Sequence, residues 1–248
     1  MEEFVEVQSS IETAPVRVTA ATRVVRVGLI IIGVLAWFAT QSLISKRGFP
    51  SGTIGDNLHL LTAPLNYYLM QHAYLANGLL IVSSAFIDLF AILLLLRSVI
   101  GPTIRPFLGL VLLFGLRQIL QALCALPQPE NMIWHNPGIP SLLVTYSVAN
   151  DFFFSGHTSV AVYGAFELSR LGKRWLTFSV IGIAVFEMLT VLTLRAHYTM
   201  DVFAAAVTAL LVGLMADRIA RPIDRALGRL TRNGLRRVRD QVESPINP

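Results

Sequence analysis

Cysteine and charged residues are both scarce in this chain of 248 residues. It contains one cysteine, Cys124, and charged residues make up 14% of the sequence. A single cysteine excludes an intrachain disulfide framework and any metal site built from several cysteines of one chain. Soluble domains carry about 25% charged residues. With 54% hydrophobic residues, the chain therefore has the composition of a membrane protein.

The chain also lacks internal repeats, low-complexity tracts and linkers, which favours one membrane domain over several soluble ones. Its first dozen residues, MEEFVEVQSSIE, are acidic and do not resemble the basic start of a cleaved signal peptide. We therefore expect the first apolar segment to be a signal anchor.

Six segments are candidates for membrane-spanning helices, each of which needs about 20 mostly apolar residues. We expect an all-α, polytopic membrane protein with six transmembrane helices. The expected spans cover residues 27–43, 75–96, 107–126, 156–171, 176–194 and 202–216. The fourth is the shortest and most polar. A short helix interrupted by Pro64 is expected between the first two spans, and a proline-rich, non-helical loop between the third and fourth.

Basic residues predict the orientation of the chain. They flank the second and fourth connections and fill the tail, which holds eight arginines between residues 218 and 239. Only Lys46, Arg47 and Arg195 fall on the opposite side. The positive-inside rule then places both termini in the cytoplasm. We divide the chain into a cytoplasmic segment (1–26), a six-span catalytic domain (27–217) and a basic tail (218–248). The tail is either an amphipathic helix on an anionic leaflet or a solvated segment that only orients the protein.

Two polar strings interrupt the apolar pattern: DFFFSGHTSV, from residue 151, and RAHYTMD, from residue 195. In the second, His197 and Asp201 stand four residues apart and share a helical face. An aspartate that binds one imidazole nitrogen leaves the other free for attack or proton transfer. Forty residues separate His157 from His197, enough for two helices of about 30 Å that run out and back. We expect the three side chains to converge at the non-cytoplasmic face as a catalytic set.

The strings FSGH (154–157) and HYTMD (197–201) resemble motifs of the type-2 phosphatidic acid phosphatase superfamily. They are most similar to its sphingomyelin synthase branch and to the plant phosphatidylcholine:diacylglycerol cholinephosphotransferases. Proteins of this branch also carry an arginine ahead of a Leu-Pro-x-Pro string, which here is Arg117 ahead of residues 126–129. The resemblance covers about residues 75–215, and the RAHYTMD form is nearest the plant enzymes.

Two departures separate the chain from the ordinary lipid phosphatases of that superfamily. Phe154 stands where they have proline, and Thr190-Val191 stands where they have a Ser-Arg pair that binds phosphate. Arg117 or Arg195 would then have to supply the positive charge. These differences favour head-group transfer over hydrolysis without excluding hydrolysis.

The resemblance implies roles for individual residues. His197, held by Asp201, would attack the phosphorus of a phospholipid, and His157 would serve as acid and then base. The expected substrate-binding residues are Arg117, Ser155, Gly156, Arg195 and Tyr198. The scheme needs neither a metal nor a cofactor, and the carboxylate-rich signature of CDP-alcohol phosphotransferases is absent.

The sequence therefore predicts an enzyme that moves a phosphocholine-like head group from a phospholipid donor to diacylglycerol or ceramide. Its partners would be these lipids and the bilayer, with no nucleic acid, and the sequence does not indicate an oligomeric state. The site would lie on the extracytoplasmic or lumenal face. The first alternative is a lipid phosphate phosphatase that uses the same histidines with water as acceptor. The second is a membrane scaffold without activity.

Four ionisable residues fall inside predicted spans: Asp88, Arg117, Glu167 and Glu187. Charges at such depth are normally paired or face a cavity. They form either a structural salt bridge between Arg117 and one or two of the carboxylates, or a polar chamber below the histidines in which Arg117 faces phosphate. His59, His72 and His135 are expected in loops or at the interface, and residues 152–154 are expected to pack the start of the fourth span or line a lipid entrance.

Overall fold

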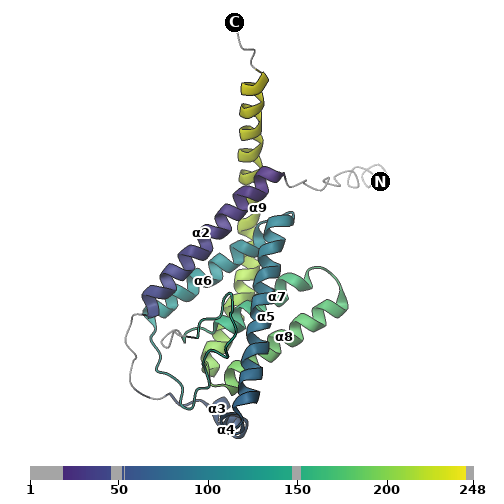
Figure 1. The fold of residues 1–248 in the computed structure, drawn as a ribbon. Helices are drawn as coiled ribbons and strands as arrows, with labels where there is room; N and C mark the ends of the chain where they lie inside the picture. Colours follow the sequence, from purple (N-terminus) through teal and green to yellow (C-terminus); the bar gives the residue numbers. More distant parts are fainter. Residues whose placement is uncertain (1–18, 46–51, 53, 147–151, 244–248) are drawn as a thin grey trace, which may run out of the picture.

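The computed structural model describes residues 19–45, 52, 54–146 and 152–243, with side chains in the last range as far as residue 230. All regular secondary structure in these ranges is α-helical, as expected (Figure 1). The helices are α2 (Ala20–Ser45), α3 (Asn57–Leu61), α4 (Ala63–Gln71), α5 (Ala73–Ile100), α6 (Arg105–Leu123), α7 (Gly156–Ser169), α8 (Arg174–Thr193) and α9 (Thr199–Glu243).

The two ends of the membrane domain differ from the expected boundaries. Helix α2 begins at Ala20, so the end of the expected N-terminal segment is already helical. Helix α9 continues from the last expected span into the tail as one helix of 45 residues, with Pro222 inside it (Figure 1). The tail therefore starts without a break, and its contact with a leaflet stays a prediction. Residues 1–18 and 244–248 lie outside the described part of the chain.

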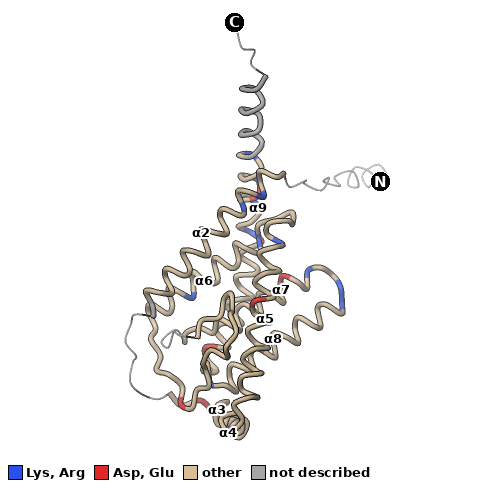
Figure 2. Tube along the Cα trace, in the orientation of Figure 1, with Lys and Arg blue, Asp and Glu red and all other residues tan. Residues whose placement is uncertain are grey.

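Basic residues lie at one end of the helix pair α7–α8. Arg170, Lys173 and Arg174 belong to the connection between these helices, and α8 runs from there to the turn that carries His197. Figure 2 shows this basic connection well away from α3 and α4. The helix directions therefore separate the basic connection from the histidines, as the loop charges predict. Which end faces the cytoplasm stays a prediction.

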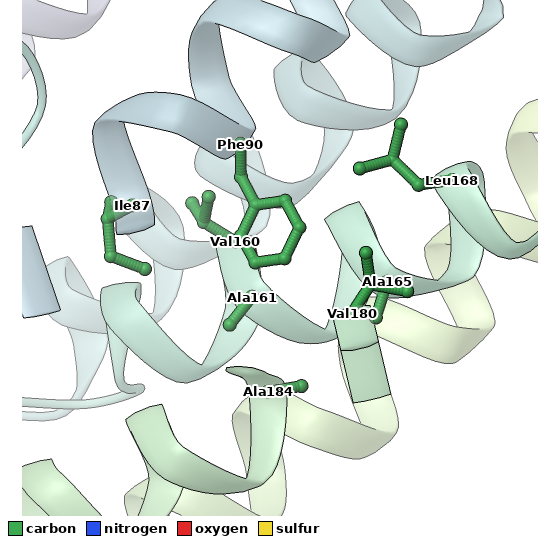
Figure 3. Close-up of a cluster of buried hydrophobic side chains, with 8 residues drawn as sticks. All are labelled: Ile87, Phe90, Val160, Ala161, Ala165, Leu168, Val180 and Ala184. Atoms are coloured by element: carbon green, nitrogen blue, oxygen red, sulfur yellow. The ribbon is translucent and has the colours of Figure 1, made fainter. Parts of the chain in front are cut away.

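Helix α7 lies at the centre of the bundle, and ten of its 14 residues are buried. It contacts α5, α6, α8 and α9. Small residues allow this close packing, since a Cβ added at Gly164 would lie 2.8 Å from the ring of Phe90. The apolar contact between α5, α7 and α8 is drawn in Figure 3; it comprises Ile87, Phe90, Val160, Ala161, Ala165, Leu168, Val180 and Ala184.

Five of the described helices are long and apolar enough to cross a membrane: α2, α5, α6, α8 and α9. The expected fourth span corresponds to α7, whose 14 residues make a helix of about 21 Å, shorter than a hydrocarbon core of about 30 Å. Neighbouring helices cover α7, so its polar residues do not have to face lipid. The structure supports a polytopic membrane protein with five helices of spanning length, and it does not confirm the expected count of six.

The connections outside the bundle are well anchored. Thr62 ends α3 and precedes α4, and Pro64 stands in the first turn of α4, so the expected interruption is present. The expected loop after α6 is non-helical through residue 146. Asp88 of α5 holds this loop, because its carboxylate accepts hydrogen bonds from the Ser141 hydroxyl and from the backbone N–H groups of residues 142 and 143. Asp88, although it lies inside an expected membrane span, therefore binds a loop. These hydrogen bonds satisfy its carboxylate without a cationic partner.

The buried glutamates have partners other than Arg117, which was one of the two arrangements expected for them. Glu167 is fully buried and pairs with Arg105, with 2.8 Å between Oε2 and Nη2. Arg105 also binds Asp217, which in turn binds Arg170. Glu187 accepts a hydrogen bond of 2.6 Å from the Ser83 hydroxyl. An ion-pair network thus joins α6, α7 and α9 at the end of α7 that lies away from His157.

Replacing Glu167 by alanine should destabilise the bundle by about 3 kcal/mol, because it leaves the half-buried Arg105 without its main counter-charge. The free energy of unfolding in detergent micelles, obtained by denaturant titration, measures this loss. Arg170→Ala is the matched control: its side chain is 37% exposed, so its removal should cost at most about 1 kcal/mol. Equal losses in the two variants would contradict a buried anchor at Glu167.

Candidate active site

His157 stands in the first turn of α7. Ser155 caps this helix, since its side-chain oxygen accepts a hydrogen bond of 3.3 Å from the backbone N–H of Thr158. Serine is among the preferred residues at such a cap, so the Ser-Gly-His string itself begins the helix. Ser155 is fully buried and His157 is 7% exposed. The imidazole is therefore held at a fixed place at the amino end of a buried helix.

His197 lies in the turn between α8 and α9. Its Nδ1 is 2.9 Å from the carbonyl oxygen of Phe152. A carbonyl oxygen only accepts hydrogen bonds, so Nδ1 carries the proton and Nε2 keeps a lone pair. The segment that precedes α7 thereby sets the tautomer of the second histidine.

Asp201 approaches His197 less closely than expected. Its Oδ2 is 3.7 Å from Nδ1, an ion-pair distance that is too long for a hydrogen bond. The same oxygen accepts a hydrogen bond of 2.9 Å from the backbone N–H of Tyr198. The carboxylate therefore caps the first turn of α9 and supplies negative charge beside the imidazole. The hydrogen bond to Nδ1 that was expected from Asp201 is made by the Phe152 carbonyl oxygen instead.

The two histidines line one cavity of about 50 Å³. Arg117 of α6 also lines this cavity, close to the amino end of α7. Trp134 and the loop residues 143–145 form part of its wall. The Trp134 ring meets the His157 ring edge-on, with 5.1 Å between the centroids. His157 Nε2 is buried without a hydrogen-bond partner among the described residues. The structure thus brings His157, His197, Arg117 and Gly156 together.

Arg117 reaches this cavity from the middle of α6. Its Nε donates a hydrogen bond of 2.9 Å to the carbonyl oxygen of Phe154. A Cβ added at Gly156 would lie 3.5 Å from the guanidinium, so the glycine lets the cation lie against the amino end of α7. Positive charge and free N–H groups at a helix start both favour a bound anion.

Arg195 and Tyr198 lie in a second cavity of about 280 Å³, which Asp56 and His59 also line. The Arg195 guanidinium donates to the carbonyl oxygens of Glu130 and His59 at 3.1 and 3.2 Å. The Tyr198 ring stacks on His59, and its hydroxyl donates to the carbonyl oxygen of Pro127. These two expected substrate-binding residues therefore hold the turn around His197 and do not line the histidine cavity.

Asp56 and His59 were not expected at the site. The Asp56 carboxylate accepts hydrogen bonds from the backbone N–H and the hydroxyl of Thr199, at 2.6 and 2.7 Å. His59 Nε2 donates to the carbonyl oxygen of His197 at 2.9 Å. Burial raises the pKa of Asp56, but the bonds from Thr199 and the nearby His59 outweigh it and keep the pKa below its ordinary value. An ionised Asp56 thus fixes the start of α9.

The remaining histidines have local partners. His72 Nδ1 donates to the carbonyl oxygen of Tyr68, and the exposed His135 binds the side-chain oxygen of Asn77. Neither lines the histidine cavity. In the described ranges, no group of three or more His, Cys, Asp or Glu side chains could hold a metal ion.

Comparison with known proteins gives one match. Residues 56–218 match the protein family described as AtPDCT1/2, whose members are phosphatidylcholine:diacylglycerol cholinephosphotransferase-like. The matched range starts at Asp56 and includes both histidines and Arg117. The comparisons with curated proteins and with solved structures give no match.

We predict that the neutral form of His197 carries its proton on Nδ1 and that the neutral form of His59 carries its proton on Nε2, because each donates to a carbonyl oxygen through that ring nitrogen. Nitrogen-15 NMR of histidine-labelled protein in micelles distinguishes the two forms. Signals are assigned by their loss in His197→Gln and His59→Gln. An Nε2–H form of His197 would contradict its hydrogen bond to Phe152.

Proposed function

This chain belongs to the AtPDCT1/2 family, and we propose on that premise that it transfers a phosphocholine-type head group from a phospholipid to a lipid alcohol. The donor is phosphatidylcholine and the acceptor is diacylglycerol, with ceramide as a second acceptor class. The observation that carries this proposal is the contact of 2.9 Å between His197 Nδ1 and the Phe152 carbonyl oxygen. This hydrogen bond leaves a lone pair on Nε2, at a cavity that also contains His157 and Arg117.

In the first step, His197 Nε2 attacks the phosphorus of the donor. A nitrogen–phosphorus bond forms while the bond from phosphorus to the glycerol oxygen breaks. The negative charge of the bound phosphate favours protonation of His157, which gives its proton to that oxygen, and diacylglycerol leaves. Asp201, 3.7 Å from Nδ1, stabilises the positive charge that the imidazole gains.

In the second step, the hydroxyl of the acceptor replaces the departed alcohol. Neutral His157 removes its proton as the acceptor oxygen bonds to phosphorus, and the nitrogen–phosphorus bond breaks. His197 returns to its neutral form and His157 is again protonated, so the cycle is balanced. One residue serves as acid and then as base, as the reversibility of an exchange between two similar alcohols requires.

Arg117 and the amino end of α7 bind the phosphoryl oxygens in this scheme. The guanidinium lies against Gly156, and the first backbone N–H groups of the helix add partial positive charge. Ser155 contributes by capping the helix. Arg195 and Tyr198 act through the turn that carries His197, because their hydrogen bonds hold that turn to α3 and to the loop after α6. The site faces the extracytoplasmic or lumenal side.

We predict that purified protein moves labelled phosphocholine from phosphatidylcholine to added diacylglycerol. His157→Ala and His197→Ala should each lower this transfer by at least about a hundredfold, the usual range for a lost acid–base or nucleophilic group. Transfer is followed by thin-layer chromatography of the lipid products.

His135→Ala is the matched control. His135 is exposed and binds only Asn77 among the interactions described, so its loss should leave transfer unchanged. Release of phosphate from phosphatidic acid, without transfer to the added alcohol, would contradict a transferase and favour a lipid phosphatase. Unchanged transfer in both His157→Ala and His197→Ala would contradict the assigned site.

A further inference from the structure

An apolar groove of about 420 Å³ lies between α2, α5 and α6, three helices of spanning length. Its lining is apolar except for Thr40 and Gln118. Small residues belong to this lining: Gly33 and Ala36 on α2 and Gly115 on α6. A Cβ added at Gly33 would lie 2.9 Å from the Phe107 ring, whereas one added at Gly115 would meet nothing within 4 Å. One of the walls of the groove, α2, lies outside the matched range 56–218, which includes both histidines of the cavity.

Helix α2 is attached to the bundle on both sides of the groove. Toward its start, the Arg26 guanidinium donates to the carbonyl oxygens of Ser98 and Gly101 and pairs with Asp224 at 3.2 Å. Toward its end, Gln118 donates to the side-chain oxygen of Gln41 at 2.9 Å. Figure 1 shows α2 and α6 running side by side between these points. Polar contacts therefore hold α2 to the bundle on both sides of the groove.

The groove adjoins the histidine cavity. Trp37, Phe114 and Leu143 line both spaces, so these three side chains form the boundary between them. The Trp37 and Phe114 rings lie against one another, with 5.3 Å between their centroids. A molecule with a polar group beside the histidines therefore has to pass only these side chains to place an apolar part between α2 and α6.

Trp37 carries an unused donor at this junction. Its Nε1 is buried and has no hydrogen-bond partner among the described residues. An indole N–H only donates, and a buried donor without an acceptor costs free energy. The junction therefore lacks one acceptor oxygen, at the point where the space changes from polar to apolar.

We propose that the groove holds one acyl chain of the donor phospholipid and that Trp37 donates a hydrogen bond to the ester oxygen of that chain. This rests on the proposed function, which places the donor phosphate beside His197. A phospholipid has the required order of groups: phosphate, glycerol ester, then hydrocarbon. Helix α2 thereby completes a lipid site whose reacting residues all belong to the matched range.

Gly115→Phe tests the groove. A Cβ added at Gly115 meets nothing within 4 Å, so a larger side chain enters the groove without a clash at that atom. Transfer to a fixed diacylglycerol is measured with dioleoyl and with dihexanoyl phosphatidylcholine as donors. We expect kcat/KM to fall about tenfold or more with the long-chain donor, the effect of losing about two buried methylene groups. The short-chain donor should react nearly as with the unmodified protein.

Gly182→Phe is the matched control, because Gly182 is an exposed position in α8 where an added Cβ also meets nothing within 4 Å. It should leave kcat/KM unchanged with both donors. An equal loss with both donors in Gly115→Phe, or no loss with either, would overturn the groove assignment. In a second series the donor is held constant and the acceptor is dioleoyl- or dihexanoylglycerol; a loss in Gly115→Phe that follows the chain length of the acceptor alone would overturn the assignment to the donor.

Trp37→Phe tests the hydrogen bond separately. Removing the indole N–H should raise KM for ester-linked phosphatidylcholine by about fivefold, the effect of one hydrogen bond. With a dialkyl-ether analogue, which has no carbonyl oxygen there, the variant and the unmodified protein should have the same KM. An equal effect on both donors would contradict the hydrogen bond.

Photocrosslinking separates failure of this inference from failure of the proposed function. Phosphatidylcholine with a diazirine at the end of one acyl chain should label α2 and α6 residues of the groove, and Gly115→Phe should reduce that labelling. Labelling without any head-group transfer would overturn the proposed reaction and keep the groove. Transfer with labelling that Gly115→Phe does not reduce would overturn the groove.

Discussion

The hydrogen bond between His197 Nδ1 and the Phe152 carbonyl oxygen is the interaction on which the rest of the site depends. It joins the segment before α7 to the turn before α9, and a backbone bond from Ser155 to Asp201 joins the same two segments again. These contacts bring the two histidines to one cavity and set the tautomer of one of them. They require α7 to start at the right depth in the bundle. A short, buried α7 meets this requirement, and a helix of full spanning length is not needed for it.

Carboxylates outside the cavity hold its walls. Asp56 binds the start of α9 through Thr199, and Asp88 binds the loop whose residues 143–145 line the cavity. Both accept backbone N–H groups, and the cation Arg117 lies at the amino end of α7, where it donates to the Phe154 carbonyl oxygen. At the far end of α7, Glu167 is bound by Arg105. The charged residues thus divide into those that fix helices and loops and those that meet at the cavity.

The convergence of the histidines was predictable because helix length alone brings His157 and His197 to the same end of α7 and α8. Their motifs also carried the family resemblance. Other features depend on contacts between distant parts of the chain, which the local sequence pattern does not contain. Hydropathy gives the depth of Glu167 but not the direction in which it points, so Arg105 was missed as its partner. Asp56 acts on Thr199, which lies 143 positions along the chain. The expected count of six spanning helices is not confirmed, because α7 has only 14 residues and five other described helices are of spanning length.

The central claim is that His197 is the nucleophile, and a covalent intermediate tests it most directly. Protein incubated with phosphatidylcholine in the absence of a lipid alcohol should accumulate a phosphocholine group on one side chain. Peptide mass spectrometry after a rapid quench at alkaline pH, where phosphorus–nitrogen bonds of this kind persist best, locates it. We predict that the added mass lies on His197 and disappears when diacylglycerol is supplied. An adduct on His157, or transfer that proceeds with no adduct at any time point, would contradict the account.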